Sequence, residues 1–429
     1  MTTKIEKISN DLLGEHYYRV KHKSGLTVLV MPKEGYSSAY ALFGTKYGSI
    51  DNCFRTSEEE TPVKVPEGIA HFLEHKLFES EELDAFERYA KTGASANAYT
   101  SFDRTCYLFS CTGNFKANLE ILLDFVQSPY FTAQTVQKEQ GIIGQEIRMY
   151  KDVPDWEVLF NLLRAMYHNH PVKIDIAGTE ETIAQIDDKL LYKCYDTFYN
   201  LNNMALAVVG NVDLDEVLEV CDRLLKDGKD VKVERIFEEE PKEVVTDHIE
   251  EELSVSSPIF NLGFKETWET PERTLKEEIC ADILLEIIAG NTSELYRELI
   301  DEKLINTSFS TEYFTGTGFA AKLFGGESAD PCLAAQKIKE KIRSFKENGV
   351  SQEDFDRTKK KLFGRTVMAF NDIDSLADSL VKSEFLSESI FDDMEIFRTL
   401  TVEDLNDHLR RTLDEKYSVL SVINPTKEK

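Results

Sequence analysis

Residues 68–78 read GIAHFLEHKLF, an apolar run interrupted by His71, Glu74 and His75. This spacing predicts a short helix, because residues three or four apart on a helix share a face, with their Cβ atoms about 5 to 6 Å apart. His71 and His75 can therefore chelate one metal ion, with Glu74 on the adjoining ridge. The alternative is a helix that carries these residues without a metal, which would leave costly polar groups in an apolar segment.

The order H-x-x-E-H is the pattern of the inverted zincins. The chain has 8 histidines among 429 residues, so a chance occurrence is expected roughly once in a hundred such chains. The chemistry needs neutral imidazole nitrogens on zinc and a carboxylate beside the bound water. We therefore predict a zinc site with Glu74 as general base. A catalytic zinc site usually has three protein ligands, so one more must come from elsewhere in the chain.

The best source of a third ligand is the stretch TAQTVQKEQGIIGQEIRMY, residues 132–150. Glu139 and Glu146 lie seven residues apart, nearly two helical turns, so both carboxylates fall on one stripe with apolar neighbours. A glutamate on an inward-facing stripe needs a partner, and a metal ion would be one. A surface helix with scattered acidic residues fits the spacing equally well, so the residues alone leave the choice open.

Length, composition and charge limit the possible functions. A hydrophobic content of 41% and a charged content of 30% are ordinary for a globular protein, and 429 residues suggest two domains. The net charge of −28 disfavours nucleic acid and anionic membranes as partners. This negative charge would attract cationic peptides if the acidic residues line a site. The alternative is that the acidic residues simply lie on the solvated exterior.

The sequence predicts a cytoplasmic protein with reduced thiols. No apolar run approaches the roughly 20 residues needed to span a bilayer, and the N-terminal residues lack a signal-peptide core. The seven cysteines are odd in number and have no C-x-x-C spacing, which argues against a disulfide framework.

Two similar halves are predicted along the chain. The first half ends in a helix, DDKLLYKCYDTFY, and a strand, MALAVVGN; the C-terminus repeats this order with TVEDLNDHLRRTL and YSVLSVIN. Between the halves lies a highly charged stretch with little apolar periodicity. We expect an N-terminal zinc-binding domain at residues 1–234, an exposed linker at 235–256, and a homologous C-terminal domain without a metal motif at 257–429.

Residues 95–100, SANAYT, form a short and uncharged predicted strand. An exposed edge strand of this kind can accept an extended peptide by β-addition. An ordinary internal strand is the alternative.

Four segments together resemble the pitrilysin or insulinase family of zinc peptidases, including its two-domain bacterial members and the subunits of the mitochondrial processing peptidase. These segments are GIAHFLEHKLF, GASANAYTSFDRTCYLF, KEQGIIGQEIRMYKDVPDW and the HPV of NHPVKIDIAGT. The resemblance implies Glu146 as third zinc ligand, Glu139 as its supporting neighbour, and Asn97 and Ala98 on a substrate-binding edge.

The same resemblance implies an α+β fold of two homologous domains, each an antiparallel sheet covered by helices, forming half of a clam-like chamber. It also implies a zinc-dependent endopeptidase that hydrolyses peptides or unfolded segments. The family's His-Pro element is structural or near the site, so His168 and His170 are not expected to bind the metal.

The second half departs from the active family members, which carry there an Arg and a Tyr that bind the scissile carbonyl. In SELYRELIDEKLINTSF the corresponding positions hold Ile300 and either Asn306 or Thr307. Because two-subunit relatives split these roles, we predict a heterodimer with a homologous subunit that lacks H-x-x-E-H and supplies Arg and Tyr. A homodimer is the alternative, and Tyr313 or Arg297 would substitute under a shifted alignment.

Two other functions compete with this prediction. One is a non-proteolytic binding or assembly subunit of the same fold, against which the intact zinc residues argue. The other is a metallohydrolase that acts on small molecules, which an enclosing chamber would not suit.

Overall fold

The computed structural model describes residues 3–57, 59–81, 83–229, 231–266 and 274–426. The chain forms two compact units, and each unit is built from three separate segments. Unit 1 comprises Met1–Gln145, Asp175–Ile236 and Val367–Phe391, and unit 2 comprises Glu146–Ile174, Phe237–Thr366 and Asp392–Lys429.

Unit 1 contains a seven-stranded sheet whose central strands β4 and β9 are buried along their whole length. Such burial on both faces suits the continuous apolar runs of these strands. Strands β3 and β9 are parallel and the other neighbours are antiparallel. In sheet order the strands are β1 (Lys4–Asn10), β2 (Glu15–Lys21), β3 (Thr27–Pro32), β9 (Met204–Gly210), β4 (Ala39–Thr45), β8 (Thr105–Cys111) and β7 (Ser95–Thr100).

Unit 1 also holds a small sheet and most of the helices of the first half. The small sheet has the order β10 (Val233–Arg235), β5 (Cys53–Thr56) and β6 (Val63–Lys64). The helices are α1 (Ile69–Leu77), α2 (Ala85–Thr92), α3 (Phe115–Val126), α6 (Glu180–Ile183), α7 (Asp188–Phe198), α8 (Leu214–Leu224) and α13 (Ile373–Leu386), together with α4 (Ala133–Tyr150) as far as Gln145; its last residues, from Glu146, belong to unit 2.

Unit 2 contains a five-stranded sheet and its covering helices. In sheet order the strands are β11 (His248–Leu253), β15 (Ser418–Pro425), β12 (Ile259–Lys265), β14 (Phe319–Glu327) and β13 (Ser310–Gly316). The helices are α5 (Pro154–Met166), α9 (Leu275–Ala289), α10 (Glu294–Asp301), α11 (Pro331–Asn348), α12 (Gln352–Ala369), α14 (Asp392–Thr399) and α15 (Val402–Arg411).

The two sheets repeat one pairing pattern. The order β3-β9-β4-β8-β7 of unit 1 corresponds to β11-β15-β12-β14-β13 of unit 2, and in each series the first pair is parallel and the rest are antiparallel. The predicted pair of α/β-layered domains is therefore present, with one parallel strand pair in each sheet where an antiparallel sheet was expected.

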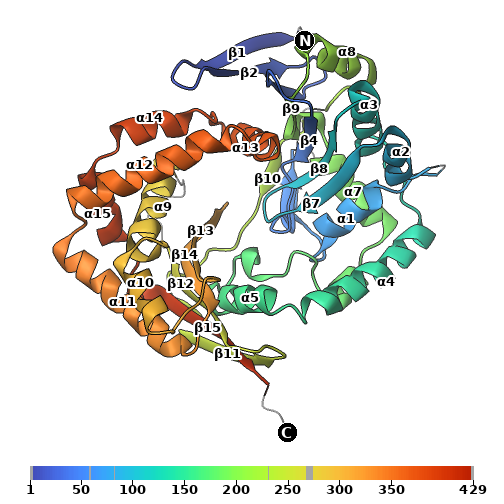
Figure 1. Ribbon diagram of the computed structural model, residues 1–429. Helices are drawn as coiled ribbons and strands as arrows, with labels where there is room; N and C mark the ends of the chain where they lie inside the picture. The colour runs from blue at the N-terminus through green and yellow to red at the C-terminus, as the bar shows by residue number, and fades with distance from the viewer. Residues whose placement is uncertain (1–2, 58, 82, 230, 267–273, 427–429) are drawn as a thin grey trace. The chain divides into compact units, whose positions relative to one another are not determined.

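Each half of the chain contributes one helix to the other half's sheet. Helix α5, from the first half, packs on β12 and β15, whereas α13, from the second half, packs on β4 and β9. In Figure 1 the orange α13 lies beside the blue and green strands, and the green α5 lies beside the red β15. The contiguous domains expected at 1–234 and 257–429 thus differ from the compact units, because these helices bury their apolar faces on sheets far away in sequence.

We call α5 and α13 the exchanged helices. A glycine and a lysine position each of them in the same way. Gly44 pairs with the second residue of β9, and Gly263 pairs with the second residue of β15. A Cβ atom at Gly44 would lie 2.8 Å from the Val381 side chain of α13, and one at Gly263 would lie 2.7 Å from the Met166 side chain of α5.

Two residues after each glycine, a lysine caps the C-terminal end of the exchanged helix. Lys46 Nζ donates to the carbonyl oxygen of Phe385 at 2.9 Å, and Lys265 Nζ donates to that of Met166 at 3.1 Å. A cation favours the carbonyl end of a helix, which carries a partial negative charge. The glycine and the lysine occupy equivalent positions in the two sheets, which supports the predicted internal duplication.

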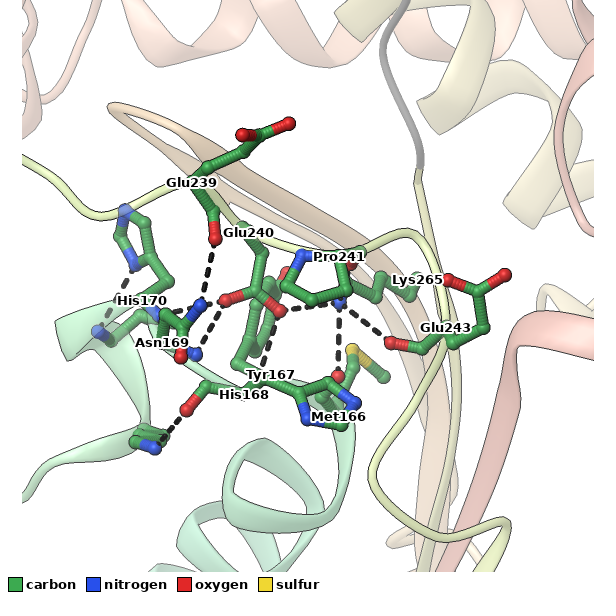
Figure 2. A network of polar contacts seen from close by, with 12 residues as sticks. Met166, Tyr167, His168, Asn169, His170, Glu239, Glu240, Pro241, Glu243 and Lys265 are labelled. Carbon is green, nitrogen blue, oxygen red and sulfur yellow. Dashed lines mark hydrogen bonds and ion pairs between the residues drawn. The ribbon is translucent and has the colours of Figure 1, made fainter.

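The stretch expected to be a linker at 235–256 is part of the folded units. Strand β11, at His248–Leu253, pairs with β15 along its whole length. Before it, the Glu240 carboxylate accepts the backbone N–H groups of His168, Asn169 and His170 at 2.7 to 2.9 Å and the ammonium of Lys265 at 2.7 Å (Figure 2). A charged stretch without apolar periodicity is typical of a solvated linker. In the folded chain, however, Glu240 of this stretch is paired with Lys265, and β11 is part of the unit 2 sheet.

All seven cysteines are free. In the part of the chain that the structure describes, no helix combines the length and apolar character needed to cross a bilayer.

Replacing Gly44 or Gly263 with Ala should lower the stability of the protein by about 1–3 kcal/mol, because the added methyl group overpacks the contact with the exchanged helix. Gly364→Ala is the matched control: an added Cβ there meets nothing within 4 Å, and alanine favours helices. Urea unfolding would measure the three variants. Equal stability of all three would contradict the close-packing account.

Candidate metal centre and peptide edge

Helix α1 presents the two motif histidines on its less buried side. Phe72 and Leu73 are fully buried, whereas His71 and His75 are partly exposed. Their ring centroids lie 4.6 Å apart, as the four-residue spacing predicts. The apolar side anchors the helix to unit 1, and the opposite side carries the imidazoles.

The start of α1 requires glycine. Gly68, the N-cap, has φ 83°, and a Cβ atom there would lie 2.3 Å from the carbonyl oxygen of Ala177. Gly178 has φ 74°, and its Cβ would lie 2.6 Å from the carbonyl oxygen of Glu67. Two backbone segments thus meet without side chains between them, and this contact fixes where α1 begins.

Helix α4 supplies the predicted third ligand. The ligand atoms of His71, His75 and Glu146 all lie within 4.8 Å of one another, and among the described residues this is the group of His, Cys, Asp and Glu side chains suited to a metal ion. In a tetrahedral site, zinc ligands about 2.0–2.2 Å from the ion lie roughly 3.5 Å from one another, so small shifts of these side chains would bring all three to one ion. Two imidazoles and one carboxylate are a donor set that zinc prefers, so the residues fit the ion.

Glu139 lies behind this group on the same helix. It is 5% exposed, and its carboxylate oxygen lies 3.0 Å from Nδ1 of His75. A carboxylate that accepts the Nδ1 proton leaves the lone pair of Nε2 for a metal and fixes the ring orientation. The inward stripe predicted for Glu139 and Glu146 is present in part: Glu139 is buried with Val136, Ile143 and Ile147, whereas Glu146 is partly exposed and Ile142 is exposed.

Although part of the His71 side chain is exposed, the protein that surrounds the ring keeps the imidazole neutral. Its pKa is lowered to about 3, chiefly because burial penalises the charged ring and secondarily because His75 lies nearby. A neutral imidazole is the form that binds a metal ion, so His71 needs no deprotonation near neutral pH.

Glu74 is buried beside the two histidines, with 8% exposure. One of its oxygens, Oε2, accepts a hydrogen bond of 2.7 Å from the hydroxyl of Thr100. Thr100 is the last residue of β7, so the predicted general base is linked directly to the predicted peptide-binding strand.

Strand β7 lies at the edge of the unit 1 sheet, where it pairs with β8. The Ser101 N–H donates to the Arg104 carbonyl at 2.8 Å and continues the β7–β8 register. Because bonded and non-bonded pairs alternate in an antiparallel ladder, the backbone groups of Ala96, Ala98 and Thr100 point to the open edge. The Asn97 side chain accepts the Ala98 N–H at 2.9 Å. Of the two residues predicted at this edge, Ala98 therefore has outward backbone groups, with its N–H held by the Asn97 side chain, whereas the backbone of Asn97 faces β8.

The histidines that follow α5 have other contacts. His170 Nε2 lies 3.0 Å from the Thr317 carbonyl oxygen, and its ring stacks on Phe237 (Figure 2 shows the surrounding network). Burial lowers the pKa of His170 to about 4. Among the described residues, the group suited to a metal ion consists of His71, His75 and Glu146 and does not include His168 or His170.

The second half has no Arg or Tyr at the positions that the resemblance indicates. Ile300 packs against the apolar core of unit 2, and Asn306 and Thr307 are exposed. Of the possible substitutes, Arg297 is exposed, and the Tyr313 hydroxyl donates to Glu266 at 3.0 Å.

Thr100 and Gly178 are site residues that the sequence did not reveal. A lone threonine 26 residues after Glu74 has no motif to mark it. The Gly178 contact depends on two backbones that meet only in the folded chain. Gly68 and Gly178 could have been suspected only as glycines flanking recognised motifs.

Known proteins similar to this chain decide its family. Residues 57–180 match the model of the insulinase family, peptidase family M16, and residues 185–362 match that of the peptidase M16 inactive domain. The uncharacterised zinc protease YmfH of Bacillus subtilis is 40% identical over 416 residues, which cover 95% of this chain and 96% of the relative. The chain belongs to the insulinase family, peptidase family M16.

Solved structures of the M16 family share its fold. An M16-like peptidase from Alicyclobacillus acidocaldarius is 37% identical, has a TM-score of 0.91 and is covered over 99% of both chains. Pitrilysin has the same fold at 16% identity with a TM-score of 0.76; the match covers 99% of this chain and 47% of the pitrilysin chain. The predicted pitrilysin-type fold is confirmed.

Glu139→Ala should weaken zinc binding about 10- to 100-fold, the usual effect of removing a partner that orients a metal-ligating histidine. Gln137→Ala, at an exposed position on the opposite face of α4 two residues earlier, should bind zinc like the wild type. Competition with a chelator of known affinity would measure both. An unchanged zinc affinity in Glu139→Ala would contradict the role of Glu139 in holding His75.

Proposed function

We propose that this M16 chain is the zinc-binding subunit of a peptidase that hydrolyses extended peptides or unfolded segments. The observation that carries the proposal is the grouping of His71, His75 and Glu146 beside the buried Glu74. The relatives named zinc proteases support it. The seven free cysteines favour a reducing compartment, and we place the protein in the cytoplasm.

His71, His75 and Glu146 would hold the ion, with Glu139 orienting His75. A bound zinc ion lowers the pKa of its water to about 7 and polarises a carbonyl group. Glu74 takes the proton of the attacking water and later passes it to the leaving amine nitrogen. Strand β7 aligns the substrate through the outward backbone groups of Ala96 and Ala98, with Asn97 beside them, so recognition depends little on side chains.

Glu74→Gln should keep zinc and lose turnover by about 10²- to 10⁴-fold, because the amide cannot accept the proton. The control is Glu87→Gln, an exposed glutamate on α2, which should leave the rate unchanged. Cleavage of a mixed peptide pool and metal analysis would be measured on the same preparations. Activity that falls only in step with zinc content would contradict the general-base role. Full zinc binding without hydrolysis by the wild type would favour the binding or assembly subunit.

A partner subunit is the second part of the proposal. Ile300 lies against the unit 2 core and Tyr313 is engaged with Glu266, so neither supplies a free donor for the scissile carbonyl. The chain also matches only 47% of pitrilysin. We propose a heterodimer with a homologous subunit that lacks H-x-x-E-H and contributes an Arg and a Tyr; a homodimer is the alternative.

Purification from the native source should yield this chain together with a second M16 chain, and hydrolysis should require both. Size-exclusion chromatography with light scattering would give the stoichiometry, and mass spectrometry would identify the second chain. Substituting the Arg or Tyr of that chain should lower kcat. Full activity from a verified monomer would contradict the partner requirement.

A further inference from the structure

Thr100 occupies the junction between the substrate edge and the general base. It is the last residue of β7, and its Oγ1 donates to Glu74 Oε2 at 2.7 Å. We propose that Thr100 is a positioning residue, whose hydroxyl holds the Glu74 carboxylate in the orientation that accepts the proton of the attacking water. This inference rests on the proposed peptidase function and adds a residue to its machinery.

A second threonine lies beside the Thr100 hydroxyl. Thr105 Oγ1 donates to the Tyr47 carbonyl oxygen at 2.9 Å and lies 3.4 Å from Thr100 Oγ1. Thr105 and Tyr47 are fully buried. An ionised carboxylate can only accept hydrogen bonds, and the 2.7 Å contact to Glu74 is much shorter than the 3.4 Å contact to Thr105, so the Thr100 proton is assigned to Glu74.

The hydrogen bond distinguishes the two carboxylate oxygens of Glu74. The terminal torsion of a glutamate is broad, so an unrestrained carboxylate samples many orientations. The bond from Thr100 to Oε2 restrains this torsion. Misplacement of a reacting group by about 1 Å can cost roughly 100-fold in rate, so restraint of this torsion bears directly on turnover.

Thr100 also relates the base to the position of the substrate. Its backbone groups point to the open edge of β7, where a peptide would pair, while its side chain bonds to Glu74 on α1. The preceding residue, Tyr99, bonds through its hydroxyl to Asp378 of α13, which Arg104 also contacts at 3.2 Å. The end of β7 is thus tied to helices on both faces, and a peptide paired with β7 shares one rigid frame with the base.

The direct test compares Thr100→Val, which keeps the shape and strand preference of threonine but removes the hydroxyl, with Thr100→Ser, which restores the hydroxyl. Thr100→Val should lower kcat about tenfold or more, with KM within about twofold. Thr100→Ser should recover most of the rate. The matched control is Thr92→Val, because the Thr92 hydroxyl is also part-buried but bonds to the Tyr89 carbonyl, away from Glu74. The protein is assayed as purified, with any co-purifying chain.

Two further measurements separate positioning from a structural role. Zinc affinity and thermal midpoint should match the wild type in Thr100→Val, and peptide affinity, measured by fluorescence anisotropy, should be equal in Glu74→Gln and Glu74→Gln/Thr100→Val. On the Glu74→Gln background, Thr100→Val should cause no further loss of residual rate, because the two residues act as a unit.

An unchanged kcat in Thr100→Val, an additive loss on the Glu74→Gln background, or a parallel loss of zinc would overturn the inference while leaving the proposed function intact. Absence of zinc-dependent hydrolysis by the wild type would overturn the proposed function, and the inference with it.

Discussion

The one-turn spacing of His71 and His75 on α1 is the constraint around which the rest of the site is arranged. It sets the distance between the two imidazoles, so the remaining metal ligand must be supplied by another segment of the chain. Glu146 does so from α4, and Glu139 fixes the orientation of His75 from the same helix. The start of α1 is set by the contact between Gly68 and the Ala177 backbone. The position of a metal ion therefore depends on backbone contacts made at glycines as well as on ligand side chains.

The two halves share a duplicated fold but differ in the segment that carries the metal residues. Each sheet holds a helix from the other half, positioned by equivalent pairs, Gly44 with Lys46 and Gly263 with Lys265. In the first half, the segment between β4 and β7 contains α1 with its histidines; in the second half, the segment between β12 and β13 contains α9, which is largely apolar and buried. The duplicated sheet architecture is thus retained in both units, whereas the H-x-x-E-H motif is present in the first half of the chain.

Sequence patterns predicted the parts of the structure that depend on local periodicity. Helical spacing gave α1 and the inward stripe of α4, and an uncharged stretch gave the edge strand β7. Patterns could not predict contacts between distant segments. Nothing in residues 373–386 indicates that they cover the first sheet, and the charged stretch containing Glu240 read as a linker because its partners are backbone N–H groups of residues 168–170. The Thr100 contact to Glu74 was hidden for the same reason.

The central claim is that one zinc ion is held by His71, His75 and Glu146. A zinc-edge anomalous difference map from crystals of the zinc-loaded protein tests it most directly. The account predicts a strong peak about 2.0–2.2 Å from a ring nitrogen of each histidine and from a carboxylate oxygen of Glu146. A strong peak coordinated by other side chains, or one bound to the histidines with Glu146 turned away, would contradict it.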